Sequence, residues 1–177
     1  MRMTTASQPP AIHLLVSGRA FARFANGLPE AQFKQQSNGK WSVADTMQHL
    51  FLSAWPVARL LAGPRDVFQQ WGYPDGPSRS YDEIADSYRR ALTAGIKAPA
   101  SFSPRPDEMN DNRATVVARF MDVYESLAAA VDTWPASDLD RFVMPHPVLG
   151  KLTVREMLDF TDIHTQHHLL IVQTQLP

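Results

Sequence analysis

The sequence contains no cysteine in 177 residues. This absence excludes disulfide bridges, thiolate zinc sites, dithiol redox motifs and a cysteine nucleophile. Any metal ion would therefore have to be bound by histidine, aspartate or glutamate. The formal net charge is only −1 and no run of lysine or arginine occurs, so the sequence predicts binding neither to nucleic acid nor to a membrane.

Long uninterrupted hydrophobic segments are also missing. Apolar stretches are broken by charges or proline well short of a membrane span, and the N-terminal MRMTTASQPP has no apolar core of signal-peptide length. We therefore expect a cytoplasmic protein. A content of 44% hydrophobic and 20% charged residues is typical of a globular chain, so we expect one domain over residues 1–177 with a flexible tail at 1–9.

The alternating pattern of strands is scarce, whereas helical periodicity recurs along the chain. The pattern predicts four long helices, over residues 10–26, from Ser42 to about 62, over about 111–133, and from Thr153 nearly to Pro177, and a shorter one over about 81–96. Helix-start signals support these boundaries, with capping boxes at Ser80/Glu83 and Thr153/Glu156 and an N-cap at Ser42 followed by Asp45. The remaining segments have loop composition. The predicted fold class is all-α, a four-helix bundle with an extra short helix in the middle connection.

Three of the six histidines lie close together in HTQHHLLIV, which begins at His164. At about 100° per residue, His164 and His168 fall one turn apart in the middle of the inward face of the last predicted helix. His167 diverges from His164 by about 60° and lies at the flank of that face. The opposite side collects Arg155, Asp162, Gln166 and Gln173.

Two imidazoles one turn apart can share a metal ion, but a pair alone binds weakly and needs a third ligand. His49 is the natural candidate, because it lies in the middle of an apolar helix and needs a partner there. The alternative is that His49 is a hydrogen-bonded core residue and that the His164/His168 pair binds no metal ion. From position alone, His13 and His146 are solvated or capping residues.

Two segments together resemble the DinB/YfiT-like superfamily. The first, GKWSVADTMQHL at 39–50, is a Trp-Ser helix entry with a histidine late in the second turn. The second, HPVLGKLTVREMLDFTDIHTQHHLLIVQ at 146–173, combines His-Pro, Gly, Leu-Thr and Glu with H-x3-H and a doubled histidine. The predicted helix over 111–133 and the PASDLDRFVMPHP after it also resemble the family, so the match covers most of residues 10–175.

The resemblance implies a DinB/YfiT-like four-helix bundle with one divalent metal ion bound by His49, His164 and His168. It implies zinc or nickel as the usual metal, with iron or manganese as further options, and a homodimer as the common assembly. It implies chemistry that depends on a low-molecular-weight thiol such as bacillithiol, mycothiol or glutathione, although other members are regarded as metal-dependent hydrolases. The segment 63–110 looks like an elaboration whose role the sequence leaves open.

Three histidine ligands would leave the ion its +2 charge and an open coordination position, as in catalytic sites. The ion would then activate a water, giving a hydrolase, or hold a substrate thiol as thiolate, giving a transferase. With the resemblance, we expect a thiol-dependent S-transferase acting on a small molecule. The alternatives are a metal-dependent hydrolase and a non-catalytic bundle that binds a metal or ligand.

Several other residues are candidates for a general base or for support of the metal ligands. They are Asp45, His146 and His167, and more weakly Glu125 and Asp159. For Asp45 we favour a role at the helix start, where a carboxylate complements the helix dipole. Four aromatic residues are candidates to line a pocket, although most should be core residues: Trp55, Phe68, Trp71 and Tyr73.

Overall fold

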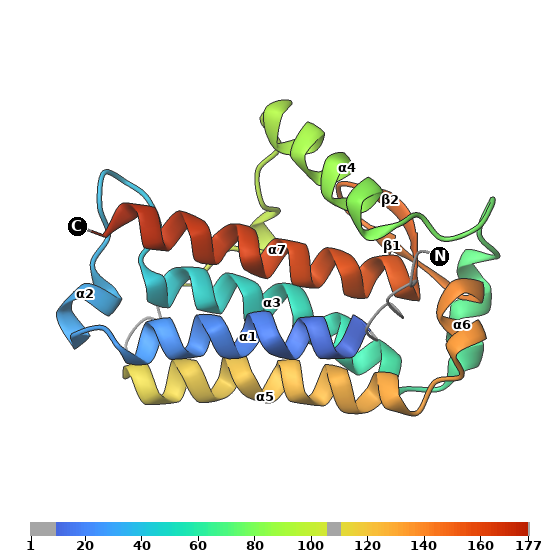
Figure 1. Ribbon diagram of the computed structural model, residues 1–177, viewed down its shortest axis with the longest axis horizontal. Coiled ribbons are helices and arrows are strands. Elements are labelled where there is room, and N and C mark those ends of the chain that lie inside the picture. Colours follow the sequence, from blue (N-terminus) through green and yellow to red (C-terminus); the bar gives the residue numbers. More distant parts are fainter. Residues whose placement is uncertain (1–9, 106–110, 177) are drawn as a thin grey trace, which may run out of the picture.

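The computed structural model describes residues 10–105 and 111–176 of the chain. The tail predicted at residues 1–9 lies outside these described residues. Four long helices form the body of the molecule (Figure 1): α1 (Pro10–Asn26), α3 (Val43–Ala62), α5 (Arg113–Asp132) and α7 (Val154–Gln175). The predicted four-helix bundle is therefore confirmed, and the helix bounds differ from the predicted ones by no more than about two residues.

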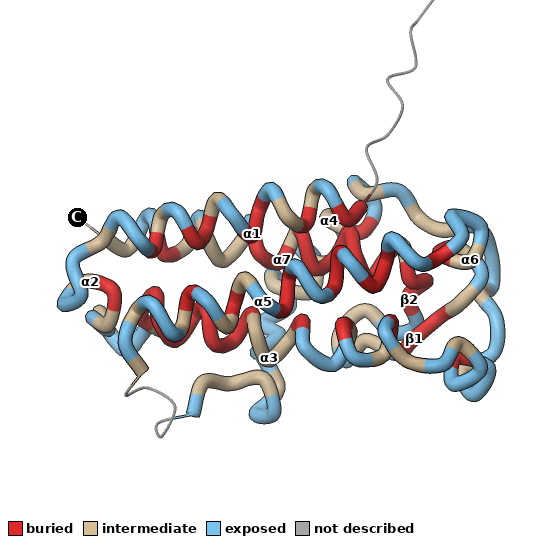
Figure 2. Tube along the Cα trace, turned by 90° about the horizontal axis from the view of Figure 1, so that it is seen from below, coloured by how far each residue is buried: buried red, intermediate tan, exposed pale blue. Residues whose placement is uncertain are grey.

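The helices of the bundle are not packed equally closely. α1 and α3 each pack along α5, and α7 packs along α1, whereas α3 and α7 are less intimately in contact. Figure 2 shows the buried residues of the helices turned toward the middle of the bundle. The fully buried side chains there include Leu14, Phe21, Met47, Phe120 and Tyr124. The looser α3/α7 side is where the predicted histidine ligands lie.

A close approach between α1 and α5 depends on Gly18. A Cβ atom added at Gly18 would lie 2.8 Å from Cδ1 of the Tyr124 ring, which is closer than real side chains allow. Tyr124 is fully buried, and its hydroxyl makes a short hydrogen bond with the hydroxyl of Thr165 on α7. Gly18 therefore lets one aromatic residue of α5 fill the middle of the bundle and reach α7.

The helix starts predicted from the sequence are present as hydrogen-bonded caps. Capping boxes join Ser42 with Asp45, Ser80 with Glu83, and Thr153 with Glu156. In each box the hydroxyl accepts from the backbone of the third helical residue, and the acidic side chain accepts from the backbone of the cap. These boxes fix the first turns of α3, of α7 and of the shorter helix α4 (Tyr81–Thr93). Of these, α3 and α7 carry the histidines of interest.

Short elements occupy segments that were predicted to be loops. They are α2 (Glu30–Lys34), η1 (Arg65–Trp71), η2 (Ala100–Phe102), α6 (Ala136–Arg141), β1 (Val143–His146) and β2 (Gly150–Thr153). β1 and β2 form an antiparallel hairpin in which His146 pairs with Gly150. Elements of three to seven residues show too little periodicity to be detected from the sequence, because a helical or strand pattern needs a longer window. The chain is thus mostly helical, with one small hairpin.

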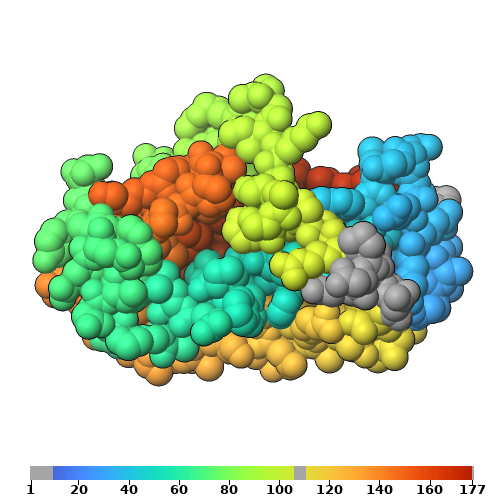
Figure 3. Space-filling view, turned by 180° about the vertical axis from the view of Figure 1, so that it is seen from behind, coloured from blue at the N-terminus to red at the C-terminus, as the bar shows by residue number. Residues whose placement is uncertain are grey.

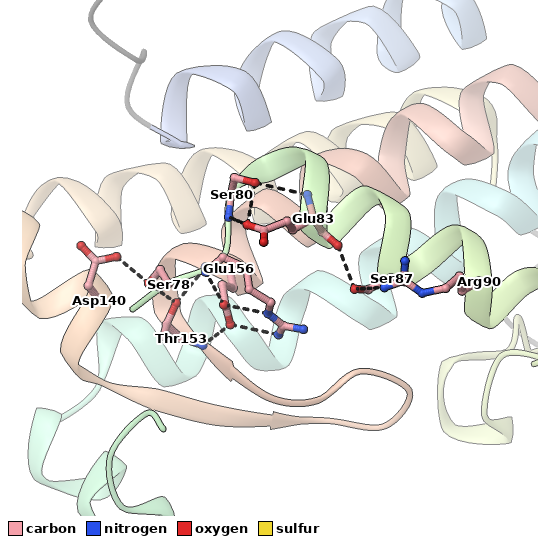
Figure 4. A network of polar contacts seen from close by, with 9 residues as sticks. Ser78, Ser80, Glu83, Ser87, Arg90, Asp140, Thr153 and Glu156 are labelled. Carbon is pink, nitrogen blue, oxygen red and sulfur yellow. Dashed lines mark hydrogen bonds and ion pairs between the residues drawn. The ribbon is translucent and has the colours of Figure 1, made fainter. Parts of the chain in front are cut away.

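The extra helix, α4 (Tyr81–Thr93), lies outside the bundle across α7 (Figure 1). It ends three residues before the predicted boundary, because Gly95 has a φ of +82° and breaks the helix. A polar network fastens its start (Figure 4). The Arg79 guanidinium lies 2.9 Å from the Glu156 carboxylate of α7, and the Ser78 hydroxyl bonds to Asp140 and to Thr153. The segment before α4 is therefore tied to the first turn of α7.

None of the described helices is both long enough and apolar enough to cross a membrane.

Candidate metal centre

His49 lies at the end of the second turn of α3, in the buried N-terminal part of that helix. The capping box at Ser42 fixes the start of that helix, and seven consecutive residues up to His49 are buried. The indole of Trp41, just before the cap, packs against the imidazole of His49 with ring centroids 4.9 Å apart. The His49 ring therefore packs against an aromatic side chain, and its Nε2 atom is directed toward α7.

α7 brings His164 and His168 to the same point. The Nε2 atom of His164 lies 3.0 Å from Nε2 of His49 and 3.1 Å from Nε2 of His168. The three ligand atoms all lie within 4.8 Å of one another. The structure thus brings together the three histidines that the sequence singled out, from helices more than 100 residues apart in the chain.

The hydrogen-bond partner of Nδ1, the second ring nitrogen of His49, determines which tautomer the ring adopts. Nδ1 of His49 lies 2.8 Å from the backbone carbonyl oxygen of Phe102, which can only accept a hydrogen bond. In the neutral ring Nδ1 therefore carries the proton and Nε2 presents a lone pair to the cluster. Metal-binding histidines characteristically donate their remote N–H to a carbonyl in this way, because the bond fixes the ring and raises its basicity.

Burial keeps these rings neutral. It lowers the pKa of His49, and the pKa values of His164 and His168 are lowered well below the ordinary histidine value. Desolvation is the main cause for each ring, and repulsion among the neighbouring imidazoles adds to it for His164 and His168. Neutral imidazole is the form that binds metal, so no proton must be removed from the cluster near neutral pH.

The donor set fits a divalent cation. Two nitrogens that bind one tetrahedral zinc ion at about 2.0–2.1 Å are separated by about 3.3 Å, close to the two observed distances. Hydrogen bonds alone satisfy the cluster poorly, because a single proton on His164 Nε2 can serve only one of its two close contacts well. A cation among the lone pairs would satisfy all three nitrogens.

The three histidines lie on the wall of a cavity of about 590 Å³ between α3, α7, the hairpin and the α4–η2 segment. Figure 3 shows the hollow on the surface, surrounded by the orange hairpin region, the yellow-green segment after α4 and teal α3. Such a volume is in the range that binds a small organic molecule. Of the four aromatic residues proposed for a pocket, only Trp71 lines it; Phe68 is fully buried, and Trp55 and Tyr73 are exposed.

His146, at the end of β1, also lines the cavity. Its Nδ1 accepts hydrogen bonds from the backbone N–H groups of Val148 and Leu149, at 3.2 and 3.0 Å. Nδ1 therefore has no proton, and the neutral ring carries its proton on Nε2. Burial lowers the pKa of His146 to about 4, so this neutral form is the one present near pH 7. His146 is a hydrogen-bond donor in this state.

His167 lies beside the triad on the same cavity wall. Its ring is 5.4 Å from the ring of Tyr88, in edge-to-face geometry, and 5.3 Å from that of His168. Burial lowers the pKa of His167 and raises that of Tyr88 to about 12, so both groups are neutral near pH 7. The nitrogens of His167 are outside the group of three converging ligand atoms.

Three carboxylates considered as general bases lie elsewhere. Asp45 is buried in its capping box, where one oxygen accepts from the Ser42 backbone and hydroxyl and from the Gln36 amide. Glu125 is exposed on α5, and Asp159 is buried on the side of α7 that faces away from the triad. Among the described residues that line the cavity there is no aspartate or glutamate.

Several residues of the site were not foreseen as parts of it. Trp41 contacts two histidines of the cluster, Tyr88 packs against His164, and Phe102 supplies the carbonyl that holds His49. A backbone carbonyl has no sequence signal, because every residue carries one. The Trp-Ser sequence before α3 indicated a role for Trp41 at the start of the helix, but not its contact with the histidines.

With this geometry in place, comparison with known proteins places the chain in a family. A model of the DinB superfamily matches residues 13–172. The uncharacterized protein YuaE of Bacillus subtilis (strain 168) is 27% identical over 145 residues, which cover 81% of this chain and 82% of YuaE. The structure of YfiT from Bacillus subtilis, described as a probable metal-dependent hydrolase with an unusual four-helix bundle topology, superposes with a TM-score of 0.57. That superposition covers 98% of this chain and 89% of YfiT at 16% identity, which supports a shared fold. The chain belongs to the DinB superfamily.

Proposed function

We propose that the protein is a metal-dependent hydrolase that binds one divalent cation through His49, His164 and His168. The observation that carries this proposal is the convergence of three neutral imidazole nitrogens within 4.8 Å on the wall of a cavity. Three protein ligands leave a coordination position open, which distinguishes catalytic from structural sites. The fold shared with YfiT, itself described as a probable metal-dependent hydrolase, supports the same class of reaction.

Zinc or nickel is the proposed metal, since imidazole suits both and affinity rises along the first-row series; iron and manganese are weaker options. A divalent ion held by three neutral ligands supplies Lewis acidity, which lowers the pKa of a water and polarises a carbonyl group.

The chain itself has two tasks. The Phe102 carbonyl holds the proton of His49 on Nδ1, so that Nε2 keeps its lone pair. The mostly apolar walls of the cavity lower the local dielectric constant, which strengthens electrostatic interactions at the site. Because the described lining residues include no carboxylate, the site provides no acidic side chain as a general base there.

The S-transferase expected from the sequence is the second candidate. The neutral donor set favours it as well, because an ion held by His49, His164 and His168 would keep its +2 charge and would favour the thiolate form of a substrate thiol. A thiol would then occupy the position that the hydrolase uses for water. The small-molecule substrate and the homodimer stay predictions.

The test combines metal analysis with turnover. The purified protein is stripped with chelator, reloaded separately with Zn²⁺, Ni²⁺, Fe²⁺ and Mn²⁺, and assayed on nitrophenyl esters, an anilide and a phosphodiester. A second set of assays adds glutathione, bacillithiol or mycothiol with an electrophile. We expect metal-dependent ester hydrolysis that needs no thiol, and a loss of at least roughly 100-fold in His49→Ala.

Glu125→Ala is the matched control, because Glu125 is exposed on α5 away from the cavity. Turnover only with a thiol would replace the hydrolase by the transferase. A wild-type protein that binds none of the four metals would overturn both enzymes and leave a non-catalytic bundle.

A further inference from the structure

The segment from α4 to η2 forms one wall of the cavity. Tyr88 and Leu92 on α4, Ile96 after it, and Pro99 and Phe102 near η2 all line the space. This is the part of the chain that the sequence marked as an elaboration of unknown role. Since the same segment supplies the carbonyl that orients His49, it shapes both the cavity and the histidine cluster.

The opposite wall is apolar as well. α3 contributes Leu50, Val57 and Leu60, and the indoles of Trp41 and Trp71 complete this side. Among the described lining residues the single formally charged side chain is Lys97, which is exposed. Away from the histidine cluster, a charged group placed deep in such a space would lose hydration without a partner, so these apolar walls select against it.

Several polar side chains line the cavity, and some of them already form hydrogen bonds within the protein. The Ser53 hydroxyl donates to the His49 carbonyl, and the Thr161 hydroxyl donates to the Met157 carbonyl. His146 differs, since its Nδ1 is occupied by two backbone N–H groups and its proton lies on Nε2. The ring can therefore offer a hydrogen bond to an acceptor such as a carbonyl oxygen.

We propose that the substrate is an uncharged, largely apolar carbonyl compound, such as an ester or amide of an apolar acid. Its apolar body packs against the α4–η2 wall, and its carbonyl oxygen accepts a hydrogen bond from Nε2–H of His146. This substrate class rests on the proposed hydrolase function, but the binding of an apolar molecule does not require metal and is measured separately.

The first experiment measures binding of the uncharged fluorophore N-phenylnaphthylamine to chelated and to zinc-loaded protein. We expect the uncharged probe to bind in both states, and in the chelated protein at least roughly tenfold tighter than anilinonaphthalene sulfonate, which adds one negative charge to the same rings. Leu92→Asp should weaken binding of the uncharged probe at least roughly tenfold, whereas Thr93→Asp, with the same charge on the exposed side of α4, should leave it unchanged.

A second variant guards against misfolding of Leu92→Asp. Ile96 lines the cavity but is 44% exposed, so Ile96→Asp removes no core packing and should also weaken probe binding. Equal binding of the two fluorophores, or equal effects of the substitutions at Leu92 and Thr93, would overturn the proposed substrate class.

The second experiment compares nitrophenyl esters of acetate, butyrate and octanoate. We expect kcat/KM to rise with chain length in the wild type and to lose this dependence in Leu92→Asp. His146→Phe keeps an aromatic ring but removes the donor, so kcat should fall at least roughly tenfold while affinity for N-phenylnaphthylamine is retained. A long-range ¹H–¹⁵N spectrum of the histidine rings should show His146 protonated on Nε2.

The two proposals fail in different ways. If the probe binds as expected but no ester is hydrolysed, the hydrolase is wrong and the apolar ligand class stands. If esters are hydrolysed without dependence on chain length and the probe does not bind, the hydrolase stands and the substrate class is wrong. A His146 ring protonated on Nδ1 would contradict the assigned donor.

Discussion

The two sides of α7 bury polar groups in different ways. One side carries Glu156, Asp159 and Asp162 toward α1, α4 and the segment before α4, whereas the other carries His164 and His168 toward the cavity. The Glu156 carboxylate is bonded to Arg79 and to the Thr153 backbone, and Asp162 accepts from the Tyr81 hydroxyl and the Gln166 amide. Glu156 is therefore satisfied by the chain itself, and Asp162 through its Oδ2 atom, whereas Oδ1 of Asp162 is buried without a hydrogen bond to any described residue.

On the imidazole side, hydrogen bonds within the protein cannot pair all the ring nitrogens. Its three ring nitrogens point at one another, and the available protons cannot satisfy every contact between them. Buried polar groups are normally paired within the protein, so a cluster that lacks an internal pairing indicates an external ligand. Burial and clustering of polar groups therefore do not by themselves identify a binding site; the imidazole cluster is distinguished by three converging nitrogens that lack enough protons to pair with one another.

The largest contrast should appear in metal affinity on the imidazole side. His168→Ala removes one of the three converging nitrogens, and we expect the affinity for Zn²⁺ to fall at least roughly 100-fold in calorimetric titration. His167→Ala is the control on the same helix, because its nitrogens do not join the cluster, and the affinity should change by less than about threefold. Equal losses in the two variants would show that the ligands have been assigned wrongly.

On the carboxylate side, Glu156→Ala should reduce stability and leave the metal site intact. It removes half of the capping box and the ion pair with Arg79, so urea unfolding should show a loss of about 2–3 kcal/mol. Zinc affinity of the folded variant should stay within about twofold of the wild type. A large loss of zinc affinity would show that the two sides of α7 are coupled and would contradict their independence.

Asp159→Asn should stabilise the protein near pH 7.5 by about 1–3 kcal/mol. Burial raises the pKa of Asp159 to about 6 in the folded protein, against an ordinary value near 3.8, so its ionised form destabilises the fold at neutral pH. As the pH falls through 6, the folded protein takes up this proton before the unfolded chain does, and the penalty is relieved. The advantage of Asn should therefore shrink between pH 6 and pH 4 in urea titrations. An advantage that does not change with pH would contradict the raised pKa.

Much of the bundle could be predicted from local sequence. Ser42, Ser80 and Thr153 each mark a helix start by chemistry confined to one turn, and all three caps are present. The approach of His164 and His168 to each other follows from helical phase, which depends only on their spacing. Their approach to His49 depends on the tertiary fold; the position of His49 in an apolar helix made it a candidate, and the family resemblance implied the complete set of three.

The outer side of α7 shows why the rest could not be predicted. Helical phase placed Asp162 and Gln166 away from the core, yet Asp162 is buried. The reason is that α4 lies over this side, and phase within one helix does not reveal which other element covers it. The same holds for the cavity, whose wall comes from segments predicted to be loops. The hydrolase and transferase interpretations differ in substrate, which local patterns do not encode.

The contact between the Phe102 carbonyl and His49 makes the outer segment and the histidine cluster thermodynamically interdependent. A molecule that rests on the α4–η2 wall and shifts Phe102 would change the basicity of His49, and hence the affinity for a cation. Because such coupling is reciprocal, a bound cation would alter affinity for that molecule by the same factor. The Phe102 carbonyl oxygen, 53 residues along the chain from His49, would thus couple the binding of a cation to the binding of a small molecule in the cavity.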